Sequence, residues 1–186
     1  VNKTISFKSR IRIFNKLYFN MSLKKFLYGR DKLTCQLAQS ILEDKLICEI
    51  GDEEIKKINK SRQSILNVLE SSSIIYGVNT GIGELCNTKI SDSDSKLLQE
   101  NLLKSHAVGV GDNAPIEISK LMMILKVHSL CKGFSGISIE VIKRICWHIE
   151  KNIIPIIPSQ GSVGASGDLA PLAHLFLPLI GLGEVM

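Results

Sequence analysis

The sequence predicts a mainly α fold that is interrupted by glycine-rich loops. Apolar residues recur at helical spacing in six segments from residue 34 onward. Strand signals are few, because the β-branched run "IIPIIP" at 153–158 carries two prolines and suits an extended loop. Glycine-rich stretches at 76–84 and 161–168 separate the helical segments and are the natural places for a binding or catalytic site.

The start of several helices is marked by capping chemistry. Thr34 is a side-chain cap at the start of the first helix, and acidic residues in the first turn of the second suit the helix dipole. Pro115 is a favourable first-turn residue, and Gly133 ends the helix that follows it. The expected helices cover 34–45, 51–72, 91–106, 115–133, 138–152 and the apolar segment after Asp168.

The charge of the chain is unevenly distributed. The net charge of the 186 residues is +5, but residues 1–30 hold eight Lys or Arg and no acid. The remainder holds 15 basic and 18 acidic residues, so the body of the protein carries no nucleic-acid-type basic surface. A hydrophobic content of 45% is ordinary for a globular domain.

Residues 1–20 form an atypical basic leader with three interpretations. The three interpretations are a targeting peptide, a basic arm for an anionic partner, and a translated stretch upstream of the native start. We favour the last, because Met21 opens a plausible natural N-terminus, "MSLKKFLYGRDKLT". On this interpretation residues 21–186 are the native part of the chain.

Cysteine and histidine usage argues against disulfides and metal sites. The five cysteines are odd in number and form no C-x-x-C pair, which favours reduced thiols in the cytoplasm. The four histidines form no metal-ligand motif, so no metal is expected. The most apolar stretch, "LAPLAHLFLPLIGLG", is too short to span a bilayer, and no membrane partner is expected.

The stretch "GSVGASGDLAPLAH" at 161–174 fits none of the common nucleotide or hydrolase motifs. Its glycines have G-x-x-G-x-x-G spacing, which differs from the dinucleotide fingerprint, and the other loop, "GVNTGIGE", lacks the lysine of a P-loop. Around Ser166 the chain also misses the last glycine of the G-x-S-x-G hydrolase elbow.

Ala165, Ser166 and Gly167 permit a different chemistry, which uses the backbone. In a very tight turn, the Gly167 nitrogen can attack the Ala165 carbonyl carbon, and glycine resists that approach least. Loss of one water closes an imidazolone, and loss of the Ser166 hydroxyl as a second water leaves an exocyclic methylidene. Ordinary side chains supply no comparable electrophile. On chemistry alone, an ordinary small-residue turn with Asp168 as a helix cap is the stronger interpretation.

Several motifs in one order resemble the aromatic amino acid ammonia-lyases. These are "YGVNTGIGE", "LLQENLLKSHAVGVGD", "CKGFSGIS" and "IIPIIPSQGSVGASGD", so the resemblance runs from about residue 30 to 186. It implies a large helical-bundle lyase with glycine-rich active-site loops. It also implies the prosthetic group 4-methylidene-imidazol-5-one (MIO), formed autocatalytically from Ala165, Ser166 and Gly167, and no diffusible cofactor.

The resemblance assigns roles to the two glycine loops. Tyr76 matches the tyrosine that removes a β-proton from the substrate, with a packing role as the alternative. Gly77, Gly81 and Gly83 would let that loop close over substrate. Asp168 either holds the ring-forming loop or caps the following helix, and capping is at least as strong an interpretation as a catalytic role.

Ser105 and His106 are the clearest indication of the substrate. Histidine-specific members resemble this chain in having Ser-His here, whereas phenylalanine and tyrosine lyases tend to have Phe-Leu or His-Leu. The implied reaction is deamination of L-histidine to trans-urocanate and ammonia. The alternative functions are a phenylalanine or tyrosine ammonia-lyase, an aminomutase, or a non-catalytic protein. The alternative role of His106 is to cap the end of a helix. Departures from the family pattern are Ile82, Lys126 and Ser138.

The end of the sequence also departs from a complete family member. "GLGEVM" follows the most apolar helix directly, which indicates an N-terminal fragment of a longer enzyme. Members of the family are homotetramers whose sites combine several subunits. We therefore expect a homotetramer at full length, and we expect the 186 residues alone to be inactive.

Overall fold

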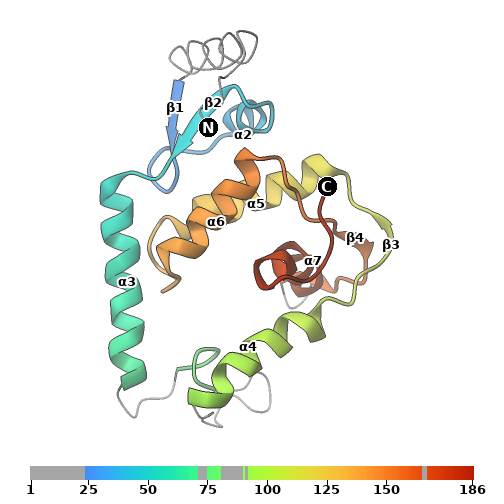
Figure 1. Ribbon diagram of the computed structural model, residues 1–186. Coiled ribbons are helices and arrows are strands. Elements are labelled where there is room, and N and C mark those ends of the chain that lie inside the picture. Colours follow the sequence, from blue (N-terminus) through green and yellow to red (C-terminus); the bar gives the residue numbers. More distant parts are fainter. Residues whose placement is uncertain (1–23, 71–74, 81–89, 91, 165–166) are drawn as a thin grey trace, which may run out of the picture.

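The computed structural model describes residues 24–70, 75–80, 90, 92–164 and 167–186, and its architecture is predominantly helical (Figure 1). The predictions for residues 1–20, Gly81, Gly83, Ala165 and Ser166 lie outside these described residues. The described α-helices are α2 (Cys35–Leu42), α3 (Asp52–Glu70), α4 (Asp92–His106), α5 (Ile116–Leu130), α6 (Ile139–Glu150) and α7 (Leu169–Phe176). A 3-10 turn over Leu177–Ile180 follows α7.

The predicted helices are confirmed, and those from 34 to 152 differ from their expected bounds only near the ends. Thr34 caps α2 as expected, because its Oγ1 accepts the Leu37 amide proton at 3.3 Å. Pro115 stands immediately before α5, as expected for a helix-starting proline.

Four short strands accompany the helices and were not predicted. β1 (Lys24–Leu27) and β2 (Leu46–Glu49) form a parallel pair on either side of α2 in the sequence. β3 (Val110–Asn113) and β4 (Pro158–Gln160) form an antiparallel pair. Strands of three or four residues are too short to give a recognisable alternation of apolar and polar side chains.

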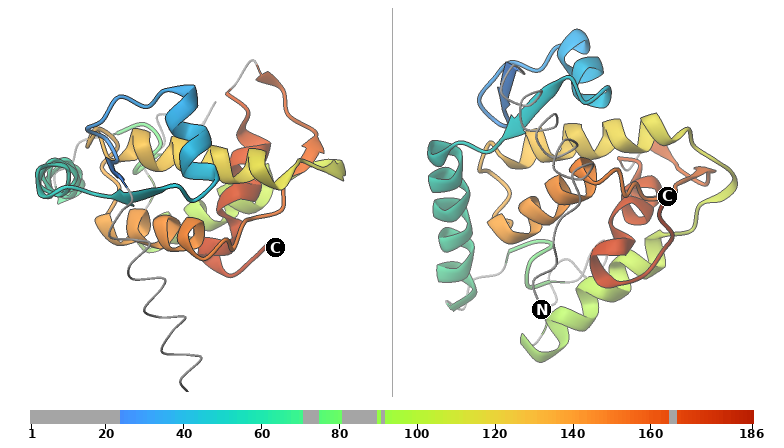
Figure 2. Two further views of the ribbon diagram at one scale, coloured as in Figure 1. Left: turned by 90° about the horizontal axis from the view of Figure 1, so that it is seen from above. Right: turned by 45° about the horizontal axis from the view of Figure 1, so that its top comes forward.

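The core lies where α5 and α6 pack side by side (Figure 2). α5 buries Ile124 and Val127 completely, and α6 buries Ile142 and Ile145. β1, β2 and α2 cover one side of this pair, and α3 stands along its edge (Figure 1). Branched aliphatic side chains dominate this core, which agrees with the low aromatic content of the sequence.

Lys120 of α5 ties together three segments of this region. Its side chain is only 8% exposed. Its Nζ donates to the Leu42 carbonyl at 3.1 Å, to Asp44 Oδ1 at 3.0 Å and to Asn152 Oδ1 at 2.8 Å. A buried ammonium group is tolerated because all three of its protons have acceptors. The turn after α2 and the turn after α6 are therefore fixed to the same helix.

The cysteines that the structure describes are all free thiols. Burial raises the pKa of Cys48 to about 11 and those of Cys131 and Cys146 to about 12, so these three are protonated at neutral pH. Across the described ranges, no helix is both long and apolar enough to cross a membrane. The same residues include no group of three or more metal-ligating side chains suited to a metal ion.

Candidate active site

The turn at residues 75–80 presents Tyr76 to solvent, with 62% of the residue exposed. Asn79 holds this turn, because its Oδ1 accepts the Ile75 amide proton at 2.8 Å. Gly77 has a φ of 72°, a left-handed conformation that favours glycine, and its N–H donates to Thr80 Oγ1 at 3.2 Å. Asn79 and Thr80 are buried, so polar groups anchor the turn while Tyr76 points outward.

Ser105 and His106 end helix α4. The Nδ1 of His106 lies 2.8 Å from the Leu102 carbonyl oxygen, which can only accept, so Nδ1 carries the proton. Ser105 Oγ donates to the same carbonyl at 3.1 Å. The pair therefore caps the last turn of α4. In the neutral ring, this arrangement leaves Nε2 with a lone pair that accepts no hydrogen bond from any described residue.

Strands β3 and β4 join the end of α4 to the second glycine loop (Figure 1). Val110, four residues after His106, pairs with Gln160, immediately before the loop. The Ala114 amide donates to the Ile157 carbonyl at 2.8 Å and extends this link. The strand pair therefore brings the segment that follows His106 next to the residues that precede the second glycine loop.

In the second glycine loop, the described residues Gly164 and Gly167 are joined by a backbone hydrogen bond. The Gly167 amide donates to the Gly164 carbonyl at 3.3 Å, and Gly167 has a φ of 91°. Among the described residues other than its chain neighbours, no atom lies within 4 Å of the position that a Cβ on Gly167 would take. Both features fit ring closure at Gly167, although Ala165 and Ser166 themselves lie outside the described residues.

Asp168 does not cap α7 with its side chain, which corrects the capping interpretation. It stands at the residue before the helix, but its φ of 53° is left-handed and its carboxylate accepts no proton from the first-turn amides. Instead, Asp168 Oδ1 accepts the Ser162 hydroxyl proton at 2.6 Å. Because Ser162 and Asp168 bracket the turn, this bond closes the loop from residue 162 to 168. This contact supports the other expectation, that Asp168 holds the loop, and its role in the site stays a prediction.

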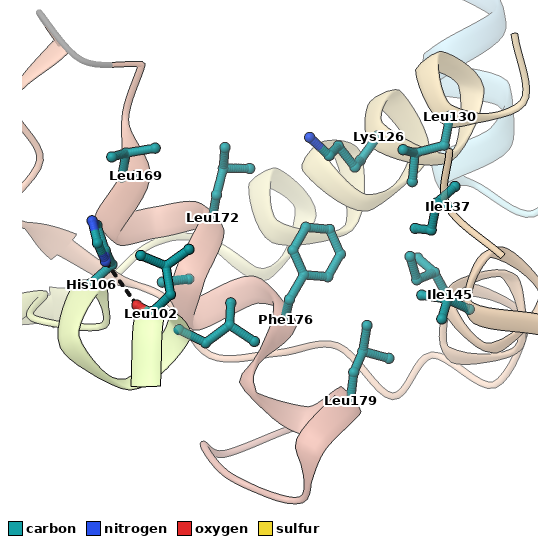
Figure 3. Close-up of a pocket in the computed structure, with 13 residues that line it drawn as sticks. Leu102, His106, Lys126, Leu130, Ile137, Ile145, Leu169, Leu172, Phe176 and Leu179 are labelled. Atoms are coloured by element: carbon teal, nitrogen blue, oxygen red, sulfur yellow. Dashed lines mark hydrogen bonds between the residues drawn. The ribbon is translucent and has the colours of Figure 1, made fainter. Parts of the chain in front are cut away.

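A cavity of about 360 Å³ lies beside His106 (Figure 3). It is lined by residues of α4, α5, α6 and α7, with His106 and Leu169 at one end and Ile137 and Ile145 at the other. His106 and Lys126 are the polar side chains of a lining that is otherwise aliphatic or aromatic. A cavity of this size, mostly apolar with a few polar groups, is typical of small-molecule sites.

No direct hydrogen bond connects Tyr76 to the other motif residues that the structure describes. These residues include Ser105, His106 and Asp168. The roles predicted for these residues therefore stay predictions.

Four residues that position the site were not assigned by the sequence analysis. Asn79 and Thr80 hold the Tyr76 turn, Ser162 closes the second loop, and His174 contacts the segment after α4. Asn, Thr and Ser commonly hydrogen-bond to nearby groups in turns, so the loop motifs themselves carried a signal for the first three. His174 contacts a residue 65 positions away, for which no local pattern exists.

A model of the aromatic amino acid lyase family matches residues 33–186. The chain belongs to this family. Its resemblance in sequence is carried by motifs on the two glycine loops and at the end of α4. β3 and β4 bring the end of α4 to the second of these loops.

Known relatives agree with this membership. The chain is 42% identical over 154 residues to a histidine ammonia-lyase of Streptococcus pyogenes serotype M5 (strain Manfredo), covering 83% of this chain and 30% of that protein. The structure of tyrosine aminomutase from Streptomyces globisporus superposes with a TM-score of 0.80 at 31% identity, over 87% of this chain and 30% of the other. That of histidine ammonia-lyase from Trypanosoma cruzi superposes with a TM-score of 0.76 at 32% identity, over the same shares. The chain thus spans about a third of the length of these relatives.

Proposed function

We propose that the protein is a carbon–nitrogen lyase that deaminates L-histidine to trans-urocanate and ammonia. The observation that carries this proposal is the His106 ring at the end of α4, with an Nε2 lone pair left for a ligand. Its chain segment is joined by β3 and β4 to the Ala165–Ser166–Gly167 loop. The identity of 42% to a histidine ammonia-lyase supports the same substrate.

Ala165, Ser166 and Gly167 are the residues that would form the MIO group, and no diffusible cofactor is required. This assignment is supported by the left-handed φ of Gly167 and by the absence of described atoms, other than those of its chain neighbours, around the position that its Cβ would take. When formed, the group supplies an electrophile that ordinary side chains lack. The hydrogen bond between Ser162 and Asp168 holds the two ends of the loop, while the residues between them would form the prosthetic group.

Tyr76 is the proposed base for the β-proton of the substrate. The reaction removes that proton and the amino group and forms the carbon–carbon double bond of urocanate. Tyr76 suits this role because buried polar side chains hold the backbone of its turn, while its phenol stays exposed. Gly77, Gly81 and Gly83 provide the backbone freedom that closure over a substrate requires.

His106 is the proposed substrate-selecting residue, together with Ser105. With its proton on Nδ1, its Nε2 can accept an N–H from the substrate imidazole. The phenyl ring of phenylalanine has no such donor and would leave Nε2 without a partner. This polar preference is set by the Leu102 carbonyl, which fixes the tautomer.

The remaining features of the proposal concern the whole protein. L-histidine is the only small-molecule partner required, and no nucleic acid, membrane or metal partner is invoked. The native-length protein is proposed to work in the cytoplasm as a homotetramer, as family members do.

A second function within the family is favoured by one observation. The cavity beside His106 is almost entirely apolar, which suits an aromatic hydrocarbon ring. A phenylalanine or tyrosine ammonia-lyase or an aminomutase would use such a lining, and a tyrosine aminomutase is among the similar structures.

A substrate panel on the native-length protein separates these functions. L-histidine, L-phenylalanine and L-tyrosine are offered separately, and urocanate, cinnamate and coumarate are followed by absorbance, with β-amino acids followed by chromatography. We expect kcat/KM for histidine to exceed that for phenylalanine by at least about 100-fold. Preference for phenylalanine or tyrosine would replace the proposed substrate, and turnover of none would support a non-catalytic protein.

The Ser166→Ala variant tests the prosthetic group. We expect loss of both the MIO absorbance and the turnover, because the methylidene carbon comes from Ser166. Ser105→Ala is a suitable comparison, because it lies outside the ring precursor and should keep the absorbance. Unchanged turnover in Ser166→Ala would overturn the mechanism.

A further inference from the structure

His174 contacts the candidate site from helix α7 although no motif assigns it a role. Its Nε2 accepts the amide proton of Gly109 at 3.0 Å. Gly109 lies three residues after His106 in the sequence. The imidazole therefore connects the helix that follows the Ala165–Ser166–Gly167 loop to the segment that follows α4. α4 and α7 also pack against each other directly, and both line the cavity beside His106.

Gly109 is crowded by the His174 side chain and by the segment from Pro158 to Gly161. A Cβ built on Gly109 would lie 3.0 Å from His174 Nε2 and 3.1 Å from the Pro158 Cβ of β4. Gly161 approaches from the other side, since its Cβ would lie 3.2 Å from the Val108 carbonyl oxygen and 3.3 Å from the Gly109 Cα. With no side chain available at 109, the imidazole is the group that fixes this junction through the backbone amide.

The half-buried His174 ring is suited to act as an acceptor. Burial lowers its pKa, which favours the neutral ring. Because Nε2 accepts from an amide, the single proton of the neutral ring is on Nδ1. The amide of Gly109 thus has a fixed partner, and the position of the chain after His106 follows from it.

A second histidine, which does not line the cavity beside His106, makes the same kind of bond. His128 of α5 accepts the Gly29 amide proton on Nδ1 at 3.2 Å. A Cβ on Gly29 would lie 2.6 Å from the Cys131 carbonyl oxygen, so this contact is also a close backbone approach. His128 therefore offers a matched control, equal in chemistry and different in place.

We propose that His174 is a positioning residue of this site, which sets the place of His106 relative to the Ala165–Ser166–Gly167 loop by accepting the Gly109 amide proton. Its catalytic consequence rests on the proposed lyase function, whereas the hydrogen bond and its effect on the segment 107–113 do not. His174 itself touches no substrate in this proposal.

The test compares three variants of the native-length protein. His174→Phe keeps a planar ring and removes the acceptor, His174→Gln returns an acceptor oxygen at a similar reach, and His128→Phe removes the matched acceptor elsewhere. Two quantities are measured for each: hydrogen exchange of the peptide covering 107–113, and kcat and KM for the amino acid that the protein turns over.

We expect His174→Phe to speed exchange in 107–113 and to lower kcat by about 10-fold to 100-fold, because small displacements of positioned groups are costly. His174→Gln should restore most of both quantities. His128→Phe should leave both near the parent values, whatever it does to the melting temperature. A purely structural role for His174 would instead give losses that follow the melting temperature in all three variants.

The outcomes separate the inference from the proposed function. Normal exchange and normal kcat in His174→Phe would overturn the inference, as would equal kcat losses in His128→Phe. If the parent turns over no amino acid, the proposed function fails, and the exchange of 107–113 alone decides the inference. If His174→Phe does not fold, Gly109→Ala disturbs the same contact from the other partner and is judged by the same two measurements.

Discussion

The α5–α6 core and the glycine-loop region are stabilised in different ways. In the core, Ile124 and Ile142 are completely buried. In the loop region, all four residues of β3 are exposed, and Tyr76 and Val163 are 62% and 71% exposed. The loops are held by backbone pairing and single hydrogen bonds, such as those of Ser162 and His174. Apolar packing therefore dominates in the core, and backbone and side-chain hydrogen bonds dominate in the glycine-loop region.

The largest expected effect is on the core side of this comparison. Ile142→Ala should lower the free energy of unfolding by about 2–5 kcal/mol, because it leaves a cavity in close-packed surroundings. The loop-side counterpart, Val110→Ala, removes an apolar group that is 61% exposed and should change it by less than about 0.5 kcal/mol. Chemical denaturation measures both. Similar losses in the two variants would break the distinction between the regions.

The next effect concerns the polar contact within the core. Lys120→Met keeps the length of the side chain but leaves the Leu42 carbonyl and Asn152 Oδ1 without their donor. We expect a loss of about 1–3 kcal/mol in the free energy of unfolding, again by chemical denaturation. Lys143→Met on the exposed face of α6 is the control and should change it by less than about 0.5 kcal/mol. Equal losses in the free energy of unfolding for the two lysine variants would show that the hydrogen bonds of Lys120 do not stabilise the fold.

The loop side should respond in activity more than in stability. Ser162→Ala removes the hydroxyl that closes the loop onto Asp168, and both residues are exposed. The free energy of unfolding should fall by less than about 1 kcal/mol, whereas kcat of the native-length enzyme should fall by about 10-fold. Ser162→Thr keeps the hydroxyl and should retain more activity than Ser162→Ala. An unchanged kcat in Ser162→Ala would remove this bond from the site.

The smallest effect is on the pH dependence of stability. Burial lowers the pKa of His128, with Lys132 lowering it further and Asp31 opposing, and burial lowers that of His174. Below the unfolded-state pKa of about 6.5, the unfolded chain binds more protons than the folded one. The melting temperature should therefore fall as the pH is lowered from this value toward the lower folded-state pKa values of the two rings. The double variant His128→Gln/His174→Gln should flatten this decline, and a melting temperature that rose on acidification would contradict the assignment.

The helices and the individual site motifs could be predicted from the sequence, because each is a local pattern of residues. Thr34 capped its helix as expected, and the Ser105–His106 pair ended α4. The contacts of Lys120 and His174 were not predictable, since they join residues from 32 to 78 positions apart. Asp168 was in part misassigned, because its left-handed backbone turns the carboxylate toward Ser162 instead of the helix amides.

The crowding at Gly109 and Gly161 also bears on how the substrate range of such an enzyme can be altered. A mutational library at either position should return few functional clones, since a Cβ at 109 would press on His174 and Pro158, and one at 161 would press on the backbone at 108–109 from a left-handed φ of 105°. Randomising Leu102, His106 and Leu169 would instead reshape the wall of the cavity without forcing the backbone segments apart. Selection for new substrates is therefore best directed at the helix faces, with the glycines left as they are.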